Sequence, residues 1–411
     1  MSDKTILLVG TWDTKEDELA YMAGVIVRQG GHVVTMDVSV LGEAARACDY
    51  SKHDVAEAGG STIEAAIETQ DENLAMQIMA RGASALALRL WRAGAFDGVL
   101  VLGGTMGTDL ALDLCQALPI GVAKYVVSTV SFSPLIPPER LAADIQMILW
   151  AGGLYGLNSI CKASLSQAAG AVLGAARAVE APRRDRPMIG MTSFGKTVLH
   201  YMVSLKPALE ARGFEVAVFH ATGMGGRAFE SLAAEGFFAA VMDFAPQELT
   251  NHIMGSSISA GPDRMTNAGR AHIPQIIAPG CYDLVDVVGW QPLPERFEGY
   301  EVHAHNRLLS SILLGSEERR EVARAICGQL GQAEAPVTLI VPRAGCNEWD
   351  RAGAPLHDAE GMAAFVEEIR KACPQNVRLL EFEAHINDAA FSECVLEVFD
   401  QWLEKGMIAR Q

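Results

Sequence analysis

The feature that most constrains this chain is a repeated pattern in which a short apolar run breaks into glycines and hydroxyl residues. It occurs at residues 5–15, TILLVGTWDTK, and again at residues 99–108, VLVLGGTMGT. Short apolar runs without alternation are typical of strands that are buried on both faces of a parallel sheet. A segment with helical periodicity follows each run. The pattern therefore predicts strand–turn–helix units and an α/β fold.

Further units of this kind fill the chain, and a charged, proline-flanked segment at residues 180–187, EAPRRDRP, separates them into two series. We therefore expect two Rossmann-like, doubly wound α/β domains with mainly parallel sheets, residues 1–182 and 183–411. We also expect one long helix at residues 62–93 and close helix packing within the glycine-rich segment 144–179. The expected strands span residues 5–10, 32–38, 99–102 and 123–130, and then 188–191, 215–220, 239–244, 275–278, 337–341 and 378–383.

The composition excludes several classes of protein. A net charge of −17 argues against a nucleic-acid or anionic-membrane partner, because phosphate backbones are bound by clustered Lys and Arg. The eight cysteines form no Cys-x-x-Cys pair, the N-terminus lacks the layout of a signal peptide, and no apolar run has the length of a membrane span. We therefore expect a cytoplasmic protein that binds a small molecule and neither nucleic acid nor a membrane.

The two glycine-rich loops of the first half have the composition of an anion site. Gly103, Gly104 and Gly107 permit a close approach of the backbone, while Thr105 and Thr108 place hydroxyls beside the free amides that begin a helix. In a doubly wound sheet, loops that follow neighbouring strands converge on one crevice. The two loops together therefore predict a phosphate site. The alternative is that the glycines only end a strand and tighten the packing of strand on helix.

Two other patterns point to nucleotide binding. Asp37 ends the second expected strand, where ribose-binding carboxylates lie in dinucleotide-binding sheets, although no Gly-x-Gly-x-x-Gly follows the first strand. Residues 190–197, GMTSFGKT, match the P-loop pattern, in which Lys196 contacts phosphates and Thr197 binds magnesium. Asp243 is then the expected acidic partner of that ion. A chance match in a glycine-rich α/β chain is the alternative.

Another glycine-rich loop, HATGMGGR at residues 220–227, leads from a strand into a helix in the second half. Successive amides in such a turn form a nest that suits a phosphate or a carboxylate. Two charged turns further along the chain add candidate contacts, although each of these loops is alternatively a simple connector. The candidate substrate-binding residues are Thr222, Gly223, Gly225, Gly226, Arg227, Arg264 and Asp283.

Three histidines lie at strand ends where a substrate would reach them: His220, His305 and His385. They are candidates for general acid–base catalysis. A zinc site needs a third or fourth ligand that the spacing does not supply, so we expect no metal site formed by side chains. The alternative is that each histidine is a hydrogen-bonded structural residue.

Four motifs occur in order along the chain: GTWDTK at 10–15, GGTMGT at 103–108, FHATGMGGRA at 219–228 and HIND at 385–388. Together they resemble an otherwise uncharacterised bacterial and plant protein family, which includes the ATP-binding N-terminal domain of the tomato mosaic virus resistance protein. The resemblance implies two Rossmann-like domains, a homodimer or higher homo-oligomer, and ATP, with Mg²⁺, bound by the first domain. The positions it assigns to the nucleotide are Gly10, Thr11, Asp13, Thr14, Lys15, Gly103, Gly104, Thr105, Met106, Gly107 and Thr108, and its Val-Ser-Thr strand end matches at Ser128 and Thr129.

These observations predict an ATP-binding metabolic enzyme that acts on a small carboxylate or sugar acid between two domains, with an ATP-dependent transferase or ligase as its reaction class. Lys15 and magnesium are expected to neutralise the phosphates. A competing hypothesis is a nucleotide-sensing regulatory module that binds without turnover. A third is ATP hydrolysis at residues 190–197. Substrate-dependent release of ADP distinguishes the enzyme from the module.

Overall fold

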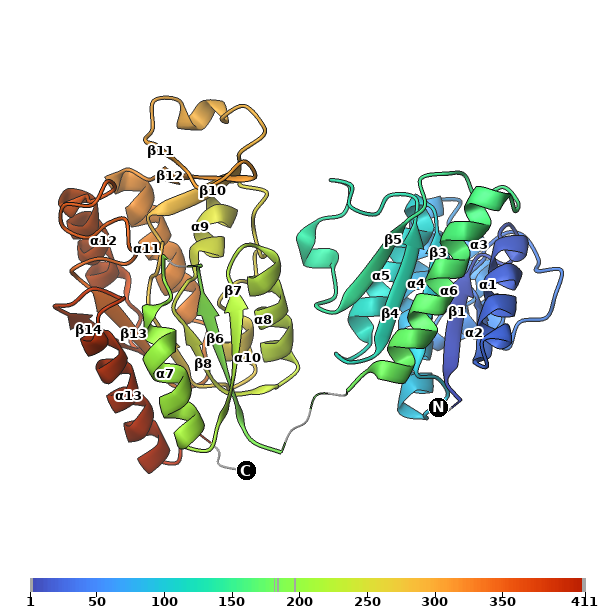
Figure 1. Cartoon of the computed structure of the whole chain (residues 1–411), viewed down its shortest axis with the longest axis horizontal. Helices are drawn as coiled ribbons and strands as arrows, with labels where there is room; N and C mark the ends of the chain where they lie inside the picture. The colour runs from blue at the N-terminus through green and yellow to red at the C-terminus, as the bar shows by residue number, and fades with distance from the viewer. Residues whose placement is uncertain (1–2, 181, 183–184, 196, 409–411) are drawn as a thin grey trace. The chain divides into compact units, whose positions relative to one another are not determined.

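The computed structural model describes residues 3–180, 182, 185–195 and 197–408, and the chain forms two compact units, Met1–Pro182 and Arg183–Gln411 (Figure 1). Each unit contains a parallel β-sheet with helices on both faces. This arrangement confirms the predicted fold class of Rossmann-like, doubly wound α/β domains with mainly parallel sheets. Lys196, which completes the P-loop pattern, lies outside the described residues.

The first unit is built on a parallel sheet with the strand order β2-β1-β3-β4-β5. Its elements are β1 (Thr5–Gly10), α1 (Glu16–Arg28), β2 (His32–Asp37), α2 (Lys52–Ala58), α3 (Ile63–Glu68), α4 (Glu72–Arg92), β3 (Gly98–Gly103), α5 (Thr105–Ala117), β4 (Ala123–Ser128), η1 (Pro138–Arg140), β5 (Ile145–Leu149) and α6 (Ser159–Ala178). The side chains of β1 alternate between two cores. Leu7 and Val9 pack with α4 and α5, while Ile6 and Leu8 pack with α1 and α6.

The connectivity of this sheet reverses between β1 and β3, because β2 lies on one side of β1 and β3 on the other. The two strands run side by side, with Val9 opposite Val101. Their carboxyl ends therefore lie at the same edge, where the loop at residues 11–15 follows β1 and Gly104 leads from β3 into the first turn of α5. Open α/β sheets bind ligands at such a reversal point. We call these strand ends, the loop at residues 11–15 and the start of α5 at residues 104–107 the β1–β3 edge.

The second unit combines a parallel sheet, in the order β14-β13-β9-β8-β6-β7, with a small antiparallel sheet, β10-β12-β11. Its elements are β6 (Met188–Ser193), α7 (His200–Ala211), β7 (Glu215–His220), α8 (Met224–Ala234), β8 (Phe238–Asp243), α9 (Gln247–Ile253), α10 (Asn267–Arg270), β9 (Gln275–Ile277), β10 (Leu284–Val288), η2 (Glu295–Phe297), β11 (Val302–Ala304), β12 (Leu309–Leu313), α11 (Ser316–Leu330), β13 (Val337–Pro342), α12 (Ala359–Ala372), β14 (Val377–Phe382) and α13 (Ala389–Glu404). Here the connectivity reverses between β6 and β8.

Three segments differ from the sequence-based expectations. Residues 62–93 form two helices, α3 and α4, because Gln70 adopts a left-handed φ of 51° and Asp71 caps α4 by accepting a hydrogen bond from the Leu74 amide at 2.9 Å. The segment 144–179 contains the strand β5 before α6. The sequence does not predict the antiparallel sheet, because its strands are short and β11 is mostly exposed.

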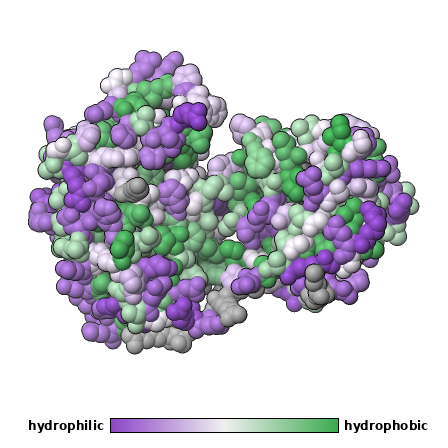
Figure 2. Space-filling view, viewed as in Figure 1, coloured by the Kyte–Doolittle hydropathy of each residue, from purple (hydrophilic) through white to green (hydrophobic). Residues whose placement is uncertain are grey.

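The visible surface of each unit mixes hydrophilic and apolar side chains (Figure 2). Such a mixture is usual, because a folded chain leaves much apolar surface exposed. Within the ranges that the structure describes, no helix is both long and apolar enough to cross a membrane.

Candidate functional site

Two carboxylates hold the loop after β1 in place by accepting hydrogen bonds. Asp37, only 4 % exposed, accepts hydrogen bonds from the Trp12 amide at 3.1 Å and from the Ser39 amide at 2.9 Å. Asp13 accepts hydrogen bonds from the Ser39 hydroxyl at 2.9 Å and from the Gly42 amide at 3.2 Å. The buried carboxylate of Asp37 holds the loop in this structure, and its contact with a ribose stays a prediction.

The remaining polar side chains of this loop are accessible. Thr14 is exposed, Thr11 and Lys15 are half-buried, and the two threonine hydroxyl oxygens lie 3.1 Å apart. The Lys15 ammonium lies 5.4 Å from the centroid of the exposed Tyr155 ring and has no ion-pair partner among the residues that the structure describes. An ammonium without an ion-pair partner and two accessible hydroxyls on one loop suit an anionic ligand.

Helix α5 begins at the β1–β3 edge without a side-chain cap. Its N-cap is Gly104, and the amides of Thr105, Met106 and Gly107 have no hydrogen-bond acceptor in the described part of the chain. Such amides carry the positive end of the helix dipole. The start of α5 therefore favours an anion.

The glycines at this edge have different roles. A Cβ at Gly10 would lie 2.9 Å from a side chain of α1, and a Cβ at Gly103 would lie 2.5 Å from the backbone of Gly107. Packing therefore requires both glycines. At Gly104, by contrast, φ is −73° and a Cβ would meet nothing closer than the Thr129 hydroxyl oxygen at 4.0 Å. The backbone at Gly104 is thus open to the close approach of a ligand.

Thr108 and Ser128 stabilise the β1–β3 edge through hydrogen bonds in the protein interior. Both are buried, and their hydroxyl oxygens lie 2.6 Å apart. Thr108 also donates to the Gly104 carbonyl at 2.7 Å, and Ser128 accepts from the Val130 amide at 3.0 Å. These bonds correct the prediction that the two hydroxyls contact a nucleotide. Thr129, which is half-buried, is the member of the Val-Ser-Thr strand end that stays at the edge.

In the second unit, charged side chains occupy the place where the strand order reverses. Arg264 is fully buried. Its guanidinium contacts three carboxylates: Asp243 at 2.9 Å, Glu248 at 2.9 Å and Glu230 at 3.2 Å. Burial raises the pKa of Glu230 and of Glu248 to about 7, although the charge of Arg264 opposes the shift. This burial corrects the prediction that Arg264 contacts a substrate.

The nest at the start of α8 holds a carboxylate, but that carboxylate belongs to Glu248. Its Oε1 accepts hydrogen bonds from the amides of Gly223 and Gly226, the latter at 3.0 Å. A Cβ at Gly225 would lie 1.7 Å from the carbonyl oxygen of His220, so this glycine serves packing. The three glycines thus shape an internal contact, which corrects their predicted contact with a substrate.

Two charged residues predicted to bind a substrate are also engaged inside the second unit. Arg227 pairs with Asp263 at 2.9 Å. Asp283 is buried and accepts hydrogen bonds from the Asn347 side chain at 3.0 and 3.2 Å. Burial raises the pKa of Asp283 to about 6. Both side chains therefore stabilise loops in this arrangement, and their contact with a substrate stays a prediction.

The loop at residues 190–197 does not have the arrangement of a P-loop. A P-loop leads directly into a helix after its lysine. Here an isolated antiparallel bridge closes the loop, and α7 begins only at His200. Asp243, the expected magnesium partner, accepts a hydrogen bond from the Thr192 hydroxyl at 2.7 Å and is paired within the buried charge cluster. These positions argue against magnesium-dependent hydrolysis at this loop.

A cavity of about 590 Å³ lies where β6 and β7 end, and it brings together His220, His305 and Thr222. Nδ1 of His220 accepts a hydrogen bond from the Gly195 amide at 3.3 Å. In the neutral ring the proton is therefore on Nε2, which leaves this nitrogen as a donor. The lining residues are Phe194, Gly195, Thr197, His220, Thr222, His303, His305, Leu309, Glu348 and Trp349.

Two lining residues come from the loop after β13. The Glu348 carboxylate accepts hydrogen bonds from Arg351 at 2.8 Å and from the Asn387 side chain at 3.0 Å. Desolvation opposes ionisation, but these hydrogen bonds lower the pKa of Glu348 below its ordinary value. The Trp349 ring lies 4.2 Å from the His303 ring, centroid to centroid. The cavity thus combines imidazoles, a carboxylate and a flat apolar surface, which are groups of an acid–base site.

His385 lies outside that cavity and is 1 % exposed. Its Nε2 is 2.8 Å from the Asn347 carbonyl and 3.2 Å from the Asp350 carboxylate, while Nδ1 accepts a hydrogen bond from the Asn387 amide at 3.1 Å. A neutral imidazole with its proton on Nε2 satisfies all three contacts. These contacts give His385 a structural role, and its catalytic role stays a prediction.

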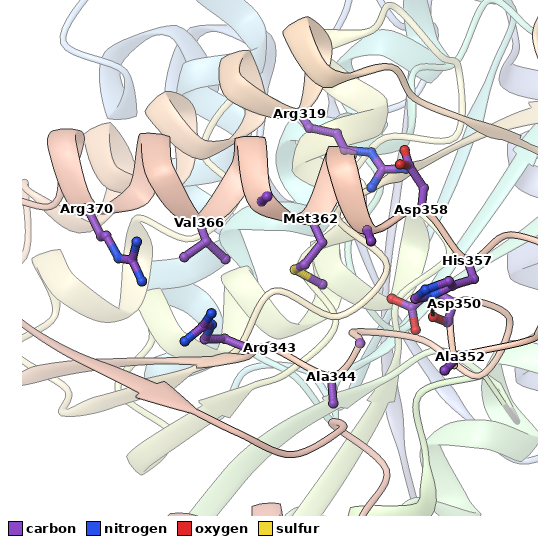
Figure 3. Close-up of a pocket in the computed structure, with 13 residues that line it drawn as sticks. Arg319, Arg343, Ala344, Asp350, Ala352, His357, Asp358, Met362, Val366 and Arg370 are labelled. Carbon is purple, nitrogen blue, oxygen red and sulfur yellow. Dashed lines mark hydrogen bonds and ion pairs between the residues drawn. The ribbon is translucent and has the colours of Figure 1, made fainter.

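Another cavity, of about 340 Å³, lies between α12 and the segment after β13 (Figure 3). Arginines dominate its charged lining, but they are paired with acids. Arg319 lies 2.9 Å from Asp358, and Arg370 lies 2.6 Å from Glu381. This pairing neutralises the arginines, so the lining does not form an anion site.

Comparisons with known proteins place this chain in a family. A model of the N-terminal domain of the uncharacterised protein family UPF0261 matches residues 4–181, and a model of its C-terminal domain matches residues 186–403. The chain belongs to the uncharacterised protein family UPF0261. This membership confirms the resemblance seen in the four sequence motifs.

UPF0261 relatives match nearly the whole chain. A UPF0261 protein of Brucella melitensis is 54% identical over 98% of this chain and 97% of its own length. One from Clostridium tetani is 32% identical over 98% of this chain and 100% of its own length. The ToMV resistance protein Tm-1(GCR237) of Solanum lycopersicum is 29% identical over 74% of this chain and 41% of its own length.

Among solved structures, E. coli ADP-heptose lps heptosyltransferase II covers 98% of this chain with 99% of its own length. The identity is 10% and the TM-score is 0.21, a likeness too low to bear on function.

In this UPF0261 chain, sequence reasoning misses Glu348 and Trp349 as cavity residues. A signal was present, because residues 347–351, NEWDR, form a polar and aromatic cluster after a buried strand. The predicted nucleotide residues that stay accessible at the β1–β3 edge are Thr11, Thr14, Lys15, Gly104, Thr105, Met106, Gly107 and Thr129.

Proposed function

We propose that this UPF0261 protein binds ATP at the β1–β3 edge of its first unit. The observation that carries the proposal is the uncapped start of α5 beside the loop at residues 11–15, at the point where the strand order reverses. The amides of Thr105, Met106 and Gly107 supply donors for phosphate oxygens. Lys15 supplies a positive charge that has no ion-pair partner among the described residues.

The fit of a polyphosphate is supported by the shape of the backbone at Gly104. A Cβ there would meet nothing closer than the Thr129 hydroxyl oxygen at 4.0 Å, so a phosphate can approach the amides closely. Magnesium fits this edge only as an ion that the phosphates themselves coordinate. The carboxylates of Asp13 and Asp37 are engaged as acceptors of hydrogen bonds from the backbone, so they do not supply its ligands. The hydroxyls of Thr11 and Thr14 are the neutral oxygen groups that remain for it.

We further propose that the second unit acts on a small carboxylate or sugar acid in the cavity of about 590 Å³. His220 presents Nε2 as a proton donor, and the hydroxyl of Thr222 and the ring of His305 add polar contacts. Glu348 provides an ionised carboxylate, and Trp349 a flat surface for the apolar face of a sugar. ATP-dependent group transfer is the reaction class, and binding without turnover is the alternative.

We also propose a cytoplasmic location and a homo-oligomeric state. The eight cysteines are all free, which supports a reducing compartment. The homo-oligomer follows only from the family resemblance, and sedimentation of the purified chain tests it.

Calorimetric titration of ATP with Mg²⁺ tests the nucleotide site on the wild type, Gly104→Val and Gly174→Val. Gly174 is the matched control, because it lies on α6 and a Cβ there meets nothing within 4 Å, so it is as free of close contacts as a Cβ at Gly104. We expect Gly104→Val to weaken ATP binding at least about tenfold, or about 1.4 kcal/mol, and Gly174→Val to leave it unchanged. A folded Gly104→Val protein that binds ATP like the wild type contradicts the proposal.

A further inference from the structure

The sequence motif at residues 385–388, HIND, follows β14 and contacts two residues that line the cavity of about 590 Å³. The Asn387 side chain donates to the Glu348 carboxylate at 3.0 Å and to the Thr197 carbonyl at 2.8 Å. Glu348 follows β13 in the chain, and Thr197 follows β6. Asn387 therefore joins two walls of the cavity from a third loop.

Both ends of the Asn387 side-chain amide are engaged. Its oxygen accepts hydrogen bonds from the amides of Leu199 and His200, each at 3.3 Å. Its nitrogen supplies the two donors that bind the carboxylate and the carbonyl. Asn387 is 7 % exposed, so these bonds are largely shielded from water. A buried amide whose donors and acceptor are all satisfied is held in a single orientation.

Both oxygens of Glu348 are held through the same motif. Oε2 accepts the hydrogen bond from Asn387, and Oε1 accepts one from Arg351 at 2.8 Å. Arg351 is itself paired with Asp388 of the motif at 3.1 Å. A carboxylate has about four lone-pair sites, so each oxygen keeps one for a ligand in the cavity. The carboxylate is thus oriented and can still contact a ligand.

The groups around Glu348 favour its ionised form. Desolvation raises its pKa, but the hydrogen bonds from Arg351 and Asn387 and the nearby His385 lower it overall. An ionised carboxylate can accept a proton from a substrate, as an acid–base site requires. The other titratable groups that line the cavity are the imidazoles of His220, His303 and His305.

We propose that Asn387 is the positioning residue of this cavity and holds the Glu348 carboxylate in the orientation and the ionised form that accept a proton. The inference rests on the proposed acid–base role of the cavity. An aspartate at position 387 would have nearly the same shape but no N–H group. It would keep an acceptor for the amides of Leu199 and His200, remove the donor to Glu348 and place a second carboxylate beside it.

The test is a carbon-13 NMR titration of the full chain, labelled at the glutamate carboxyl carbon, over the pH range in which the protein stays folded. The Glu348 signal is assigned by its loss in Glu348→Gln. The test variants are Asn387→Asp and Asn387→Ser. Gln375→Asp is the matched charge control, because Gln375 is exposed and precedes β14, whereas Asn387 follows it.

We expect Glu348 of the wild type to titrate below 4.5, the ordinary pKa of a glutamate. Asn387→Asp should move the midpoint to higher pH, because two carboxylates in contact oppose each other's ionisation. Asn387→Ser removes the donor without adding a charge, so it should move the midpoint in the same direction by less. This variant decides the test if Asn387→Asp does not fold. Gln375→Asp should leave the midpoint unchanged.

The pH dependence of substrate-dependent ADP release separates positioning from a purely structural role. Asn387→Asp should lower turnover at least about tenfold at the acidic end of the range. The loss should shrink as the pH rises, because Glu348 then regains its charge. A loss by the same factor at every pH would show a structural role and overturn the inference.

The inference and the proposed function can fail separately. A Glu348 midpoint that is unchanged in the folded Asn387 variants overturns the inference, and so does a wild-type midpoint above 4.5. If no carboxylate or sugar acid causes release of ADP, the proposed function fails. The NMR titration needs no substrate, so it still decides whether Asn387 positions Glu348.

Discussion

The Glu248 carboxylate accepts a hydrogen bond from the Gly226 amide at 3.0 Å, and this contact fills the helix start that follows β7. In the first unit, the start of α5 has no such internal acceptor within the described residues. Two helix starts with glycine-rich sequences therefore differ in what they hold. The amides at the start of α5 lack an acceptor within the described residues, while the second unit supplies its own carboxylate at the start of α8.

Replacing Glu248 with alanine should destabilise the second unit. Three buried donors lose their acceptor in Glu248→Ala, namely the Gly223 amide, the Gly226 amide and the Arg264 guanidinium. We expect the free energy of unfolding to fall by at least about 2 kcal/mol, as measured by urea denaturation. Glu393→Ala, at an exposed position of α13, is the control and should change it by less than about 0.5 kcal/mol. A Glu248→Ala protein as stable as the wild type contradicts the internal role of this carboxylate.

The buried acids should make the second unit less stable as the pH rises. Burial raises the pKa of Glu230 and Glu248 from 4.5 to about 7, so the folded state binds protons more tightly than the unfolded state. Their contribution to stability is present in full below the unfolded pKa of 4.5 and is lost as the pH rises through about 7. Urea denaturation between pH 5 and 8 measures the slope. The double variant Glu230→Gln/Glu248→Gln should have a smaller decrease than the wild type, and an equal decrease would contradict this origin.

Substitutions at His220 and at His385 should have different effects, the first on turnover and the second on the free energy of unfolding. A screen of carboxylates and sugar acids for substrate-dependent release of ADP supplies the assay. His220→Asn should lower turnover about 10²-fold, in the range of general acid–base catalysis, and leave ATP binding unchanged. His385→Ala should instead lower the free energy of unfolding by about 2 kcal/mol, because the buried Asn387 amide loses its acceptor. His200→Ala, at an exposed position, is the control. Loss of turnover without loss of stability in His385→Ala would support a catalytic role for this residue.

Gly103 and Gly104 should respond differently to substitution although they are adjacent. A Cβ at Gly103 would lie 2.5 Å from the backbone of Gly107, so Gly103→Ala should destabilise the first unit by about 1–3 kcal/mol. Gly104→Ala should not, because its Cβ meets no atom closer than the Thr129 hydroxyl oxygen at 4.0 Å. Thermal unfolding of both variants measures the difference. Equal stability of the two would show that α5 does not depend on the close contact at Gly103.

The sequence was sufficient to predict every strand of the two parallel sheets except β5, and the two glycine-rich segments of the β1–β3 edge with accessible residues such as Thr14 and Gly104. It did not predict the antiparallel sheet. The predicted features are local, because a buried strand and a glycine-rich turn are encoded by adjacent residues. The prediction was wrong for the helix at residues 62–93, where a left-handed Gln70 separates two helices. No glycine or proline in the sequence marks this break between the two helices.

The internal use of charged residues could not be predicted from the sequence. Arg264 and Glu248 look like surface groups in charged or polar segments, and only the fold brings them together at 2.9 Å in the interior. The same holds for the cavity of the second unit, because His220 and Glu348 come from loops after different strands. Burial and long-range pairing depend on tertiary structure, which a local pattern does not contain.

The binding of ATP at the β1–β3 edge is tested most directly by amide hydrogen exchange of the full chain with and without ATP and Mg²⁺. We predict slower exchange in peptides that cover residues 11–15 and 103–108, because the amides at the start of α5 gain phosphate acceptors. Peptides that cover residues 190–199 should exchange at an unchanged rate. Protection confined to residues 190–227, with none at residues 103–108, would contradict the proposed site.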